Sequence, residues 1–129
     1  MKEKEIEKAI IEWLQAQGHY AVKVQSGKML ATYKGKQRMI NMAPKGTPDI
    51  LACINGKFVA IEVKKDEAGV KAWGKVADKL RRGEAIAPSR HRELEQVLTQ
   101  IDIMNTGGVC MVCSSINELE HDLKLSKVI

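Results

Sequence analysis

Residues 48–64 read PDILACINGKFVAIEVK and contain the strongest strand signals of this 129-residue chain. Two apolar runs, residues 49–54 and 57–64, flank Asn55-Gly56, a pair that favours a type I′ hairpin turn because both central positions need a positive φ. Such a turn sets the register of the hairpin and places Asp49 directly opposite Glu62. The apolar runs are nearly continuous, as expected for strands that are covered on both faces.

Asp49 and Glu62 would then face each other with their Cβ atoms about 4.5–5.5 Å apart, where like charges destabilise a strand pair. A divalent cation is the simplest reason to keep them there. Mg²⁺ binds one or two carboxylates and completes its shell with water and phosphate oxygens. Strand alternation puts Lys64 on the same face as Glu62, beside the metal pair. The alternative is an ordinary solvated face, in which Asp49 merely starts a strand.

The first segment, residues 2–17, predicts an amphipathic helix because its apolar residues recur at three- and four-residue spacing. Taking Ile6 as the origin and about 100° per residue, Glu7 lies near 100°, between Leu14 near 80° and Ile11 near 140°. A carboxylate inside this apolar arc needs a partner, and the metal site is one candidate. The other is a surface lysine that pairs with Glu7 at the edge of the core.

The remaining segments alternate between strand and helix patterns. Strands are predicted over residues 20–25, 29–33, 37–42 and 109–113, and helices over 69–82, from 89 to about 107, and over 117–124. The helix at 69–82 carries a basic face opposite its apolar stripe. With 44% apolar residues, the chain is long enough for one core and too short for two, so we expect a single domain over residues 1–129. The fold class is α/β, a mixed central sheet flanked by helices.

The formal charge of +5 favours a polyanionic partner, although extra lysines also keep a protein in solution. Aromatic residues make up only 4% of the chain, which favours duplex or backbone contacts over the stacking of single-stranded bases. The candidates for DNA phosphate contacts, each of which has a plain surface charge as its alternative, are Lys23, Lys28, Lys45, Lys65, Lys71, Lys75 and Arg82.

Three cysteines, and no apolar run of signal-peptide or transmembrane length, predict a cytoplasmic protein without a membrane partner. Cys110 and Cys113 form a CxxC within a predicted strand. Because no second ligand pair with suitable spacing exists, this motif does not predict a zinc site.

The chain resembles the PD-(D/E)xK nuclease superfamily in three places: PDI at residues 48–50, EVK at residues 62–64, and Glu7 on the first helix, eleven residues before Gly18. Within that superfamily the short length and the stretch GTPDILA at residues 46–52 are most similar to a standalone VRR-NUC (virus-type replication-repair nuclease) domain. Archaeal-type Holliday junction resolvases are close relatives of that domain. The resemblance covers residues 3 to about 113 and implies a PD-(D/E)xK restriction-endonuclease-like core.

By this resemblance Glu7, Asp49 and Glu62 would bind Mg²⁺ or Mn²⁺ together with the backbone carbonyl of Val63. Lys64 would be the catalytic lysine. The implied activity is that of a metal-dependent DNA endonuclease that hydrolyses phosphodiester bonds at branched DNA, such as four-way (Holliday) junctions, in DNA repair. Its host would be a bacterial or phage-infected cell.

Family members often carry a glutamine on the helix after the lysine. Gln96 is the nearest match, although the helical pattern projects it to the polar side. The resemblance also implies a homodimer, because two sites related by a two-fold axis suit a four-way junction. The methionine-rich residues 29–42 are either a dimer hairpin or an ordinary part of the sheet.

Two alternative functions stay open. The first is a non-catalytic DNA-binding module that retains the nuclease fold, which would bind DNA in a salt-sensitive way and cleave nothing. The second is a sequence-specific restriction-type endonuclease, which would cut one short sequence in linear duplex.

Overall fold

The computed structural model describes residues 2–129 of the chain. In chain order the elements are α1 (Glu3–Ala16), β1 (Tyr20–Lys23), β2 (Lys28–Tyr33), β3 (Lys36–Asn41), β4 (Ile50–Ile54), β5 (Lys57–Val63), α2 (Glu67–Arg81), the short 3₁₀ helix η1 (Pro88–Arg90), α3 (His91–Asn105), β6 (Val109–Cys113) and α4 (Ile116–Leu125). None of the helices within residues 2–129 has the length and apolar character needed to cross a membrane.

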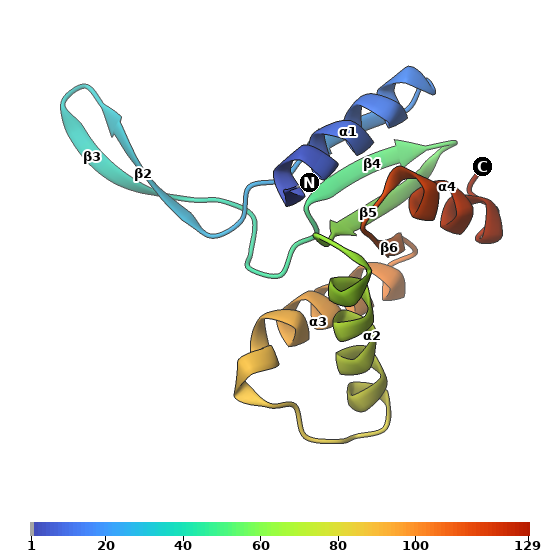
Figure 1. Cartoon of the computed structure of the whole chain (residues 1–129). Helices are drawn as coiled ribbons and strands as arrows, with labels where there is room; N and C mark the ends of the chain where they lie inside the picture. Colours follow the sequence, from blue (N-terminus) through green and yellow to red (C-terminus); the bar gives the residue numbers. More distant parts are fainter. Residues whose placement is uncertain (1) are drawn as a thin grey trace.

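The main sheet has the strand order β1-β4-β5-β6. The pairs β1–β4 and β4–β5 are antiparallel, and β6 returns parallel to β5. Helices α1 and α4 lie on one face of this sheet, and α2 and α3 pack together on the other side (Figure 1). The prediction of a mixed α/β sheet flanked by helices is therefore confirmed.

The hydrophobic core lies between the sheet and the helices α1 and α4. Its fully buried members come from α1, β4, β5, β6 and α4, and include Ile10, Leu14, Ile50, Ile54, Val59, Ile61, Cys113, Leu119 and Leu123. Alternate residues of β5 point into this core, so the residues between them face α2 and α3. Because that second face is also covered, Glu62 is buried although it points away from the apolar core.

The β4–β5 hairpin has the predicted register. Ile54 pairs with Lys57 and Ile50 pairs with Ile61. The turn residues Asn55 and Gly56 have φ values of 51° and 78°, as a type I′ turn requires. This register brings the start of β4 and the end of β5 to the same end of the sheet, away from the turn.

Strands β2 and β3 form a separate two-stranded sheet. This hairpin extends away from the rest of the molecule (Figure 1). The two strands themselves were predicted correctly, but the reading of residues 29–42 as an ordinary part of the main sheet is wrong. Large apolar side chains remain exposed along the hairpin: Met29, Leu30, Tyr33, Met39 and Ile40.

Candidate active site

The acidic residues and the lysine singled out by the sequence meet at the open end of the β4–β5 hairpin. Asp49 directly precedes β4, and Glu62 lies next to the last residue of β5. Both border a cavity of about 410 Å³ between the hairpin, the loop before β4 and the first turns of α3. The lining residues are Ser26, Lys45, Gly46, Thr47, Asp49, Glu62, His91, Arg92, Glu95 and Gln96.

The loop before β4 is held close to α3 at Gly46. The φ of this glycine is +87°, and an added Cβ would lie 2.7 Å from the carbonyl oxygen of Glu95. Only glycine combines that backbone conformation with so close an approach. The Gly-Thr-Pro-Asp segment therefore places Asp49 in the lining of the same cavity as the first turns of α3.

Asp49 lies one residue before the strand in which it was predicted, so it does not form a ladder pair with Glu62. Its Oδ2 instead accepts a hydrogen bond of 2.8 Å from the backbone N–H of Val63. The bond ties the Asp49 carboxylate to the end of β5, beside Glu62. The side chain of Val63 is buried in the core, so Val63 borders the site through its backbone.

Glu62 is 3% exposed, and this burial is the main cause of the rise in its pKa to about 8. The negative charge of Asp49 raises that pKa further, and the positive charges of Lys64 and Arg92 lower it. Within residues 2–129, the Oε2 atom of Glu62 is buried and has no hydrogen-bond partner. An acceptor oxygen is thus left unsatisfied next to a second carboxylate, which is costly without a cation or a proton.

Glu7 is buried at 6% exposure, as its place in the apolar arc of α1 predicted. Burial raises its pKa, the charge of Asp49 raises it further, and Lys23 lowers it. Its Oε2 lies 3.3 Å from the Nζ atom of Lys23, in an ion pair. Glu7 is therefore close enough to the site for the charge of Asp49 to affect it. Its ion-pair partner is Lys23.

Lys64 is held by two side chains of the site. Its Nζ donates a hydrogen bond of 2.8 Å to Oε1 of Gln96 and lies 3.7 Å from Oε1 of Glu62. Gln96 is only 5% exposed, so its projection to the polar side of the helix is wrong. The buried residues of α3 are Gln96, Val97 and Gln100, because the face of α3 that packs on the sheet carries both glutamines.

The residues at the open end fit a hard divalent cation. Two carboxylates, one with a free buried oxygen, are a donor set that Mg²⁺ or Mn²⁺ accepts. Among the described residues no three His, Cys, Asp or Glu side chains converge as a metal-binding group. Glu7, which the resemblance implied as a third ligand, is not among the residues that line the cavity. Within residues 2–129 its buried Oε2 has no hydrogen-bond partner and lies 3.3 Å from the Nζ of Lys23. A cation here would be held mainly by Asp49 and Glu62.

The site also contains residues that the sequence did not single out. His91 and Arg92 line the cavity from the first turn of α3, and Ser26 lines it from the loop after β1. The only sequence signal for His91 and Arg92 was the helix predicted from residue 89, and Ser26 had none. Arg92 and Lys45 put positive charge around the two carboxylates, which favours the binding of a phosphate, although Glu95 also lines the cavity.

The basic residues predicted to contact DNA occupy different places. Lys45 borders the site cavity, Lys65 is exposed directly after Lys64, and Lys28 lies on the β2–β3 hairpin. Lys71, Lys75 and Arg82 line a second cavity along α2.

Comparison with known proteins does not place this site in a family. Searches against protein-family models, curated protein sequences and solved structures each found no match to the chain. The resemblance to VRR-NUC domains therefore stays a prediction from three short motifs.

Proposed function

We propose that the chain is a Mg²⁺- or Mn²⁺-dependent endodeoxyribonuclease with a PD-(D/E)xK core similar to that of VRR-NUC domains. The observation that supports this most directly is the buried Glu62 carboxylate beside the half-buried Asp49, with Lys64 alongside them. Burial and the neighbouring carboxylate raise the pKa of Glu62 to about 8, so the pair is poorly suited to carry two negative charges alone. A divalent cation compensates both charges.

The chemistry follows from what each side chain offers. A bound cation would lower the pKa of water and neutralise part of the phosphodiester charge. Asp49 and Glu62, with the Val63 carbonyl as a further oxygen, would hold it. The Lys64 ammonium, fixed by Gln96, is placed to orient the attacking water and to stabilise charge that develops on the phosphate oxygens. The attacking water would lose a proton to solvent and form a bond to phosphorus, while the P–O bond to one ester oxygen breaks and the departing alkoxide takes up a proton from water.

The arrangement favours structure-specific cleavage over sequence-specific cleavage. The cavity is lined by three basic side chains that are suited to bind a phosphate, those of Lys45, His91 and Arg92. Phosphate contacts position a nucleic acid without reading its bases. We therefore propose branched DNA, such as a four-way junction in repair, as the substrate, in the cytoplasm of a bacterial or phage-infected cell.

The purified chain is expected to cleave labelled four-way, flap or splayed DNA in Mg²⁺ or Mn²⁺, and to leave the same substrates intact in EDTA. Linear duplex is the matched control. Cleavage of one short sequence in linear duplex would indicate a restriction-type enzyme. Salt-sensitive binding without cleavage in either metal would indicate a DNA-binding module that has kept the fold, and would contradict the proposed activity.

We also propose that the chain is a homodimer in which a second copy covers the β2–β3 hairpin. A lone two-stranded ribbon is marginally stable in water, and this one exposes large apolar residues on both faces. Leu30 pairs with Met39 on one face, and Met29 pairs with Ile40 on the other.

Light scattering after size exclusion is expected to give twice the mass of one chain for the parental protein. The mass of one chain is expected after these four hairpin residues are replaced by serine. Leu125→Ser, at a residue that is 73% exposed on α4, is the matched control and should leave the dimer intact. A parental protein that elutes as a monomer at high micromolar concentration would contradict the dimer.

A further inference from the structure

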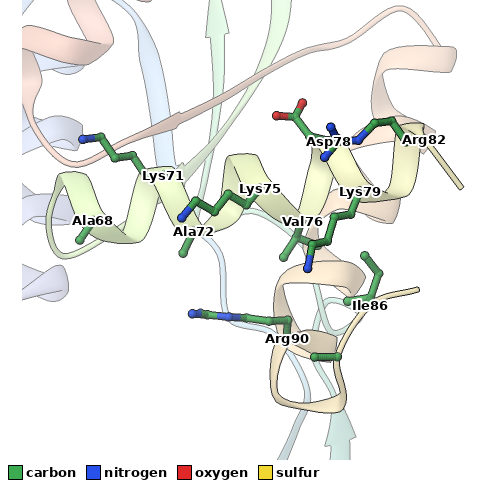
Figure 2. A pocket seen from close by; sticks show the side chains of 11 residues that line it. Ala68, Lys71, Ala72, Lys75, Val76, Asp78, Lys79, Arg82, Ile86 and Arg90 are labelled. Atoms are coloured by element: carbon green, nitrogen blue, oxygen red, sulfur yellow. The ribbon is translucent and has the colours of Figure 1, made fainter. Parts of the chain in front are cut away.

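A second cavity, of about 590 Å³, lies between α2 and the segment 86–90. It shares no lining residue with the site cavity. Its volume is within the range of about 300–1,000 Å³ that is typical of ligand-binding clefts. Five basic side chains line it, four from α2 and its C-terminus and one from η1: Lys71, Lys75, Lys79, Arg82 and Arg90. We refer to this cavity as the basic groove (Figure 2).

The basic residues of α2 form a stripe because of their spacing. Taking Lys71 as the origin and about 100° per residue, Lys75, Arg82 and Lys79 fall near 40°, 20° and 80°. From Lys71 to Lys79 the helix rises about 12 Å. On the other side of the groove, Arg90 extends along α2 beneath Lys75, and Lys79 points toward the same side (Figure 2).

Within residues 2–129, the three lysines of the groove have no ion-pair partner. Arg82 pairs with Glu84 at 3.3 Å and Arg90 pairs with Glu93 at 3.2 Å. The carboxylate of Asp78, which also borders the groove, accepts from Arg81 at 2.8 Å. In the part of the chain that the structure describes, no acidic side chain lies within ion-pair distance of Lys71, Lys75 or Lys79. Like charges gathered in this way repel one another unless an anion binds among them.

The two elements that form the groove are each close in sequence to residues of the candidate active site. Arg90 borders the groove, and the next two residues, His91 and Arg92, border the site cavity. Helix α2 begins three residues after Lys64. A nucleic-acid backbone that leaves the site past Arg92 therefore meets Arg90 and the lysine stripe next.

We propose that the basic groove binds the phosphate backbone of the duplex arm that adjoins the cleavage site, independently of base sequence. This inference rests on the proposed nuclease function and identifies where the substrate is held. One DNA strand offers a phosphate for about every 3.4 Å of helix axis, so the 12 Å stripe of lysines can reach about three phosphates. The groove floor, which includes Ala68, Ala72 and Val76, offers no donor or aromatic ring that could read or stack bases.

Salt-dependent binding of a labelled blunt duplex of about 20 base pairs, measured by fluorescence anisotropy in EDTA, tests the groove. Each lost phosphate contact makes the slope of log Kobs against log salt concentration less negative by about 0.9. The triple variant Lys71→Gln, Lys75→Gln, Lys79→Gln is therefore expected to lose about 2.7 from the slope, and Lys75→Gln alone about 0.9.

The matched control is the triple variant Lys57→Gln, Lys124→Gln, Lys127→Gln, which removes the same charge. These lysines lie at or near the turn end of the β4–β5 hairpin, where Lys57 donates to the backbone of Lys127. This variant is expected to keep the parental slope. An equal change in both triple variants would show a general effect of net charge and would overturn the groove. So would an unchanged slope in both Lys75→Gln and the groove triple variant, or a parental chain that does not bind duplex.

Cleavage of branched DNA in Mn²⁺ by the same preparations separates this inference from the proposed function. If the parental chain cleaves DNA and the groove variants keep the parental salt slope, DNA binding by the groove is refuted and the nuclease function is not. A reduced slope in the groove variants, with no cleavage by the parental chain, refutes the nuclease and leaves the groove as a DNA-binding surface. Binding of single-stranded RNA in preference to duplex, with the same loss of slope, would overturn duplex DNA as the ligand.

Discussion

Replacing Lys64 by alanine is expected to lower kcat for DNA cleavage by about 100- to 1,000-fold, the usual effect of removing one group that stabilises transition-state charge. The Lys64 ammonium lies 3.7 Å from Glu62 and donates to Gln96, so its position is fixed before substrate binds. Single-turnover cleavage rates in saturating Mg²⁺, with enough enzyme to bind all the DNA, measure this effect apart from DNA affinity. Lys57→Ala, at the exposed far end of the same strand, is the matched control and should keep the parental rate.

Gln96 is expected to act as a positioning residue for that lysine. Gln96→Leu should lower kcat by about 10- to 100-fold, less than Lys64→Ala, because the lysine keeps its charge and loses its anchor. Gln96→Glu keeps an acceptor oxygen at the same place and should retain more activity than Gln96→Leu. Parental rates in both Lys64→Ala and Gln96→Leu would exclude the assigned roles. Equal losses in the leucine and glutamate variants would indicate a packing role for Gln96.

The hairpin that carries the acidic pair was predictable because its determinants are local. Asn55-Gly56 selects the turn, the turn sets the register, and strand alternation then assigns a face to every residue. The position of Asp49 was less predictable. It lies just before β4 because its carboxylate bonds to the backbone of Val63 and so takes the place of a ladder contact.

The orientation of α3 could not be obtained from its apolar pattern. The apolar Leu98 and Ile101 are 46% and 36% exposed, while the polar Gln96 and Gln100 are buried. The spacing of apolar residues predicts which face of a helix is buried. It does not show that a buried amide on that helix has a lysine from elsewhere in the chain as its hydrogen-bond partner. Only the sheet supplies that partner, since Lys64 donates to Gln96 from the end of β5.

No local sequence pattern indicated that the β2–β3 hairpin lies outside the main sheet. Alternating apolar residues identify which side chains share a face, and the same alternation occurs in a covered strand and in an exposed ribbon. Conversely, the start of α2 lies earlier than predicted because the Asp66 side chain accepts from the N–H of Gly69 and caps the helix. Such a cap extends a helix beyond its apolar stripe.

In EDTA, the free energy of unfolding is expected to fall by on the order of 3 kcal/mol between about pH 5 and pH 8, because the pKa of Glu62 is raised in the folded chain. Burial, then the charge of Asp49, raises that pKa from 4.5 to about 8. In this pH window the folded chain holds a proton on Glu62 that the unfolded chain has released, so stability falls as pH rises. Urea denaturation at several pH values measures the effect.

Glu62→Gln replaces the carboxyl by a neutral group of the same shape and should remove most of this pH dependence. The raised pKa of Glu7 leaves a smaller remainder of the same sign. Glu12→Gln, at an exposed residue of α1, is the matched control and should keep the parental profile. A parental profile as flat as that of Glu62→Gln would mean that Glu62 is not buried against Asp49.

The same measurement tests the cation directly, because a ligand that binds only the folded chain stabilises it by mass action. Mn²⁺ at about 100 times its Kd should stabilise the parental chain by about 2.7 kcal/mol. The gain should be larger at pH 8 than at pH 5, since a cation must displace the proton that Glu62 holds at low pH. Glu62→Gln and Asp49→Asn should each lose most of the gain, whereas Glu12→Gln should keep it. If Mn²⁺ stabilised all four proteins equally, the cation would bind elsewhere, and the closeness of Asp49 to the buried Glu62 would need another explanation.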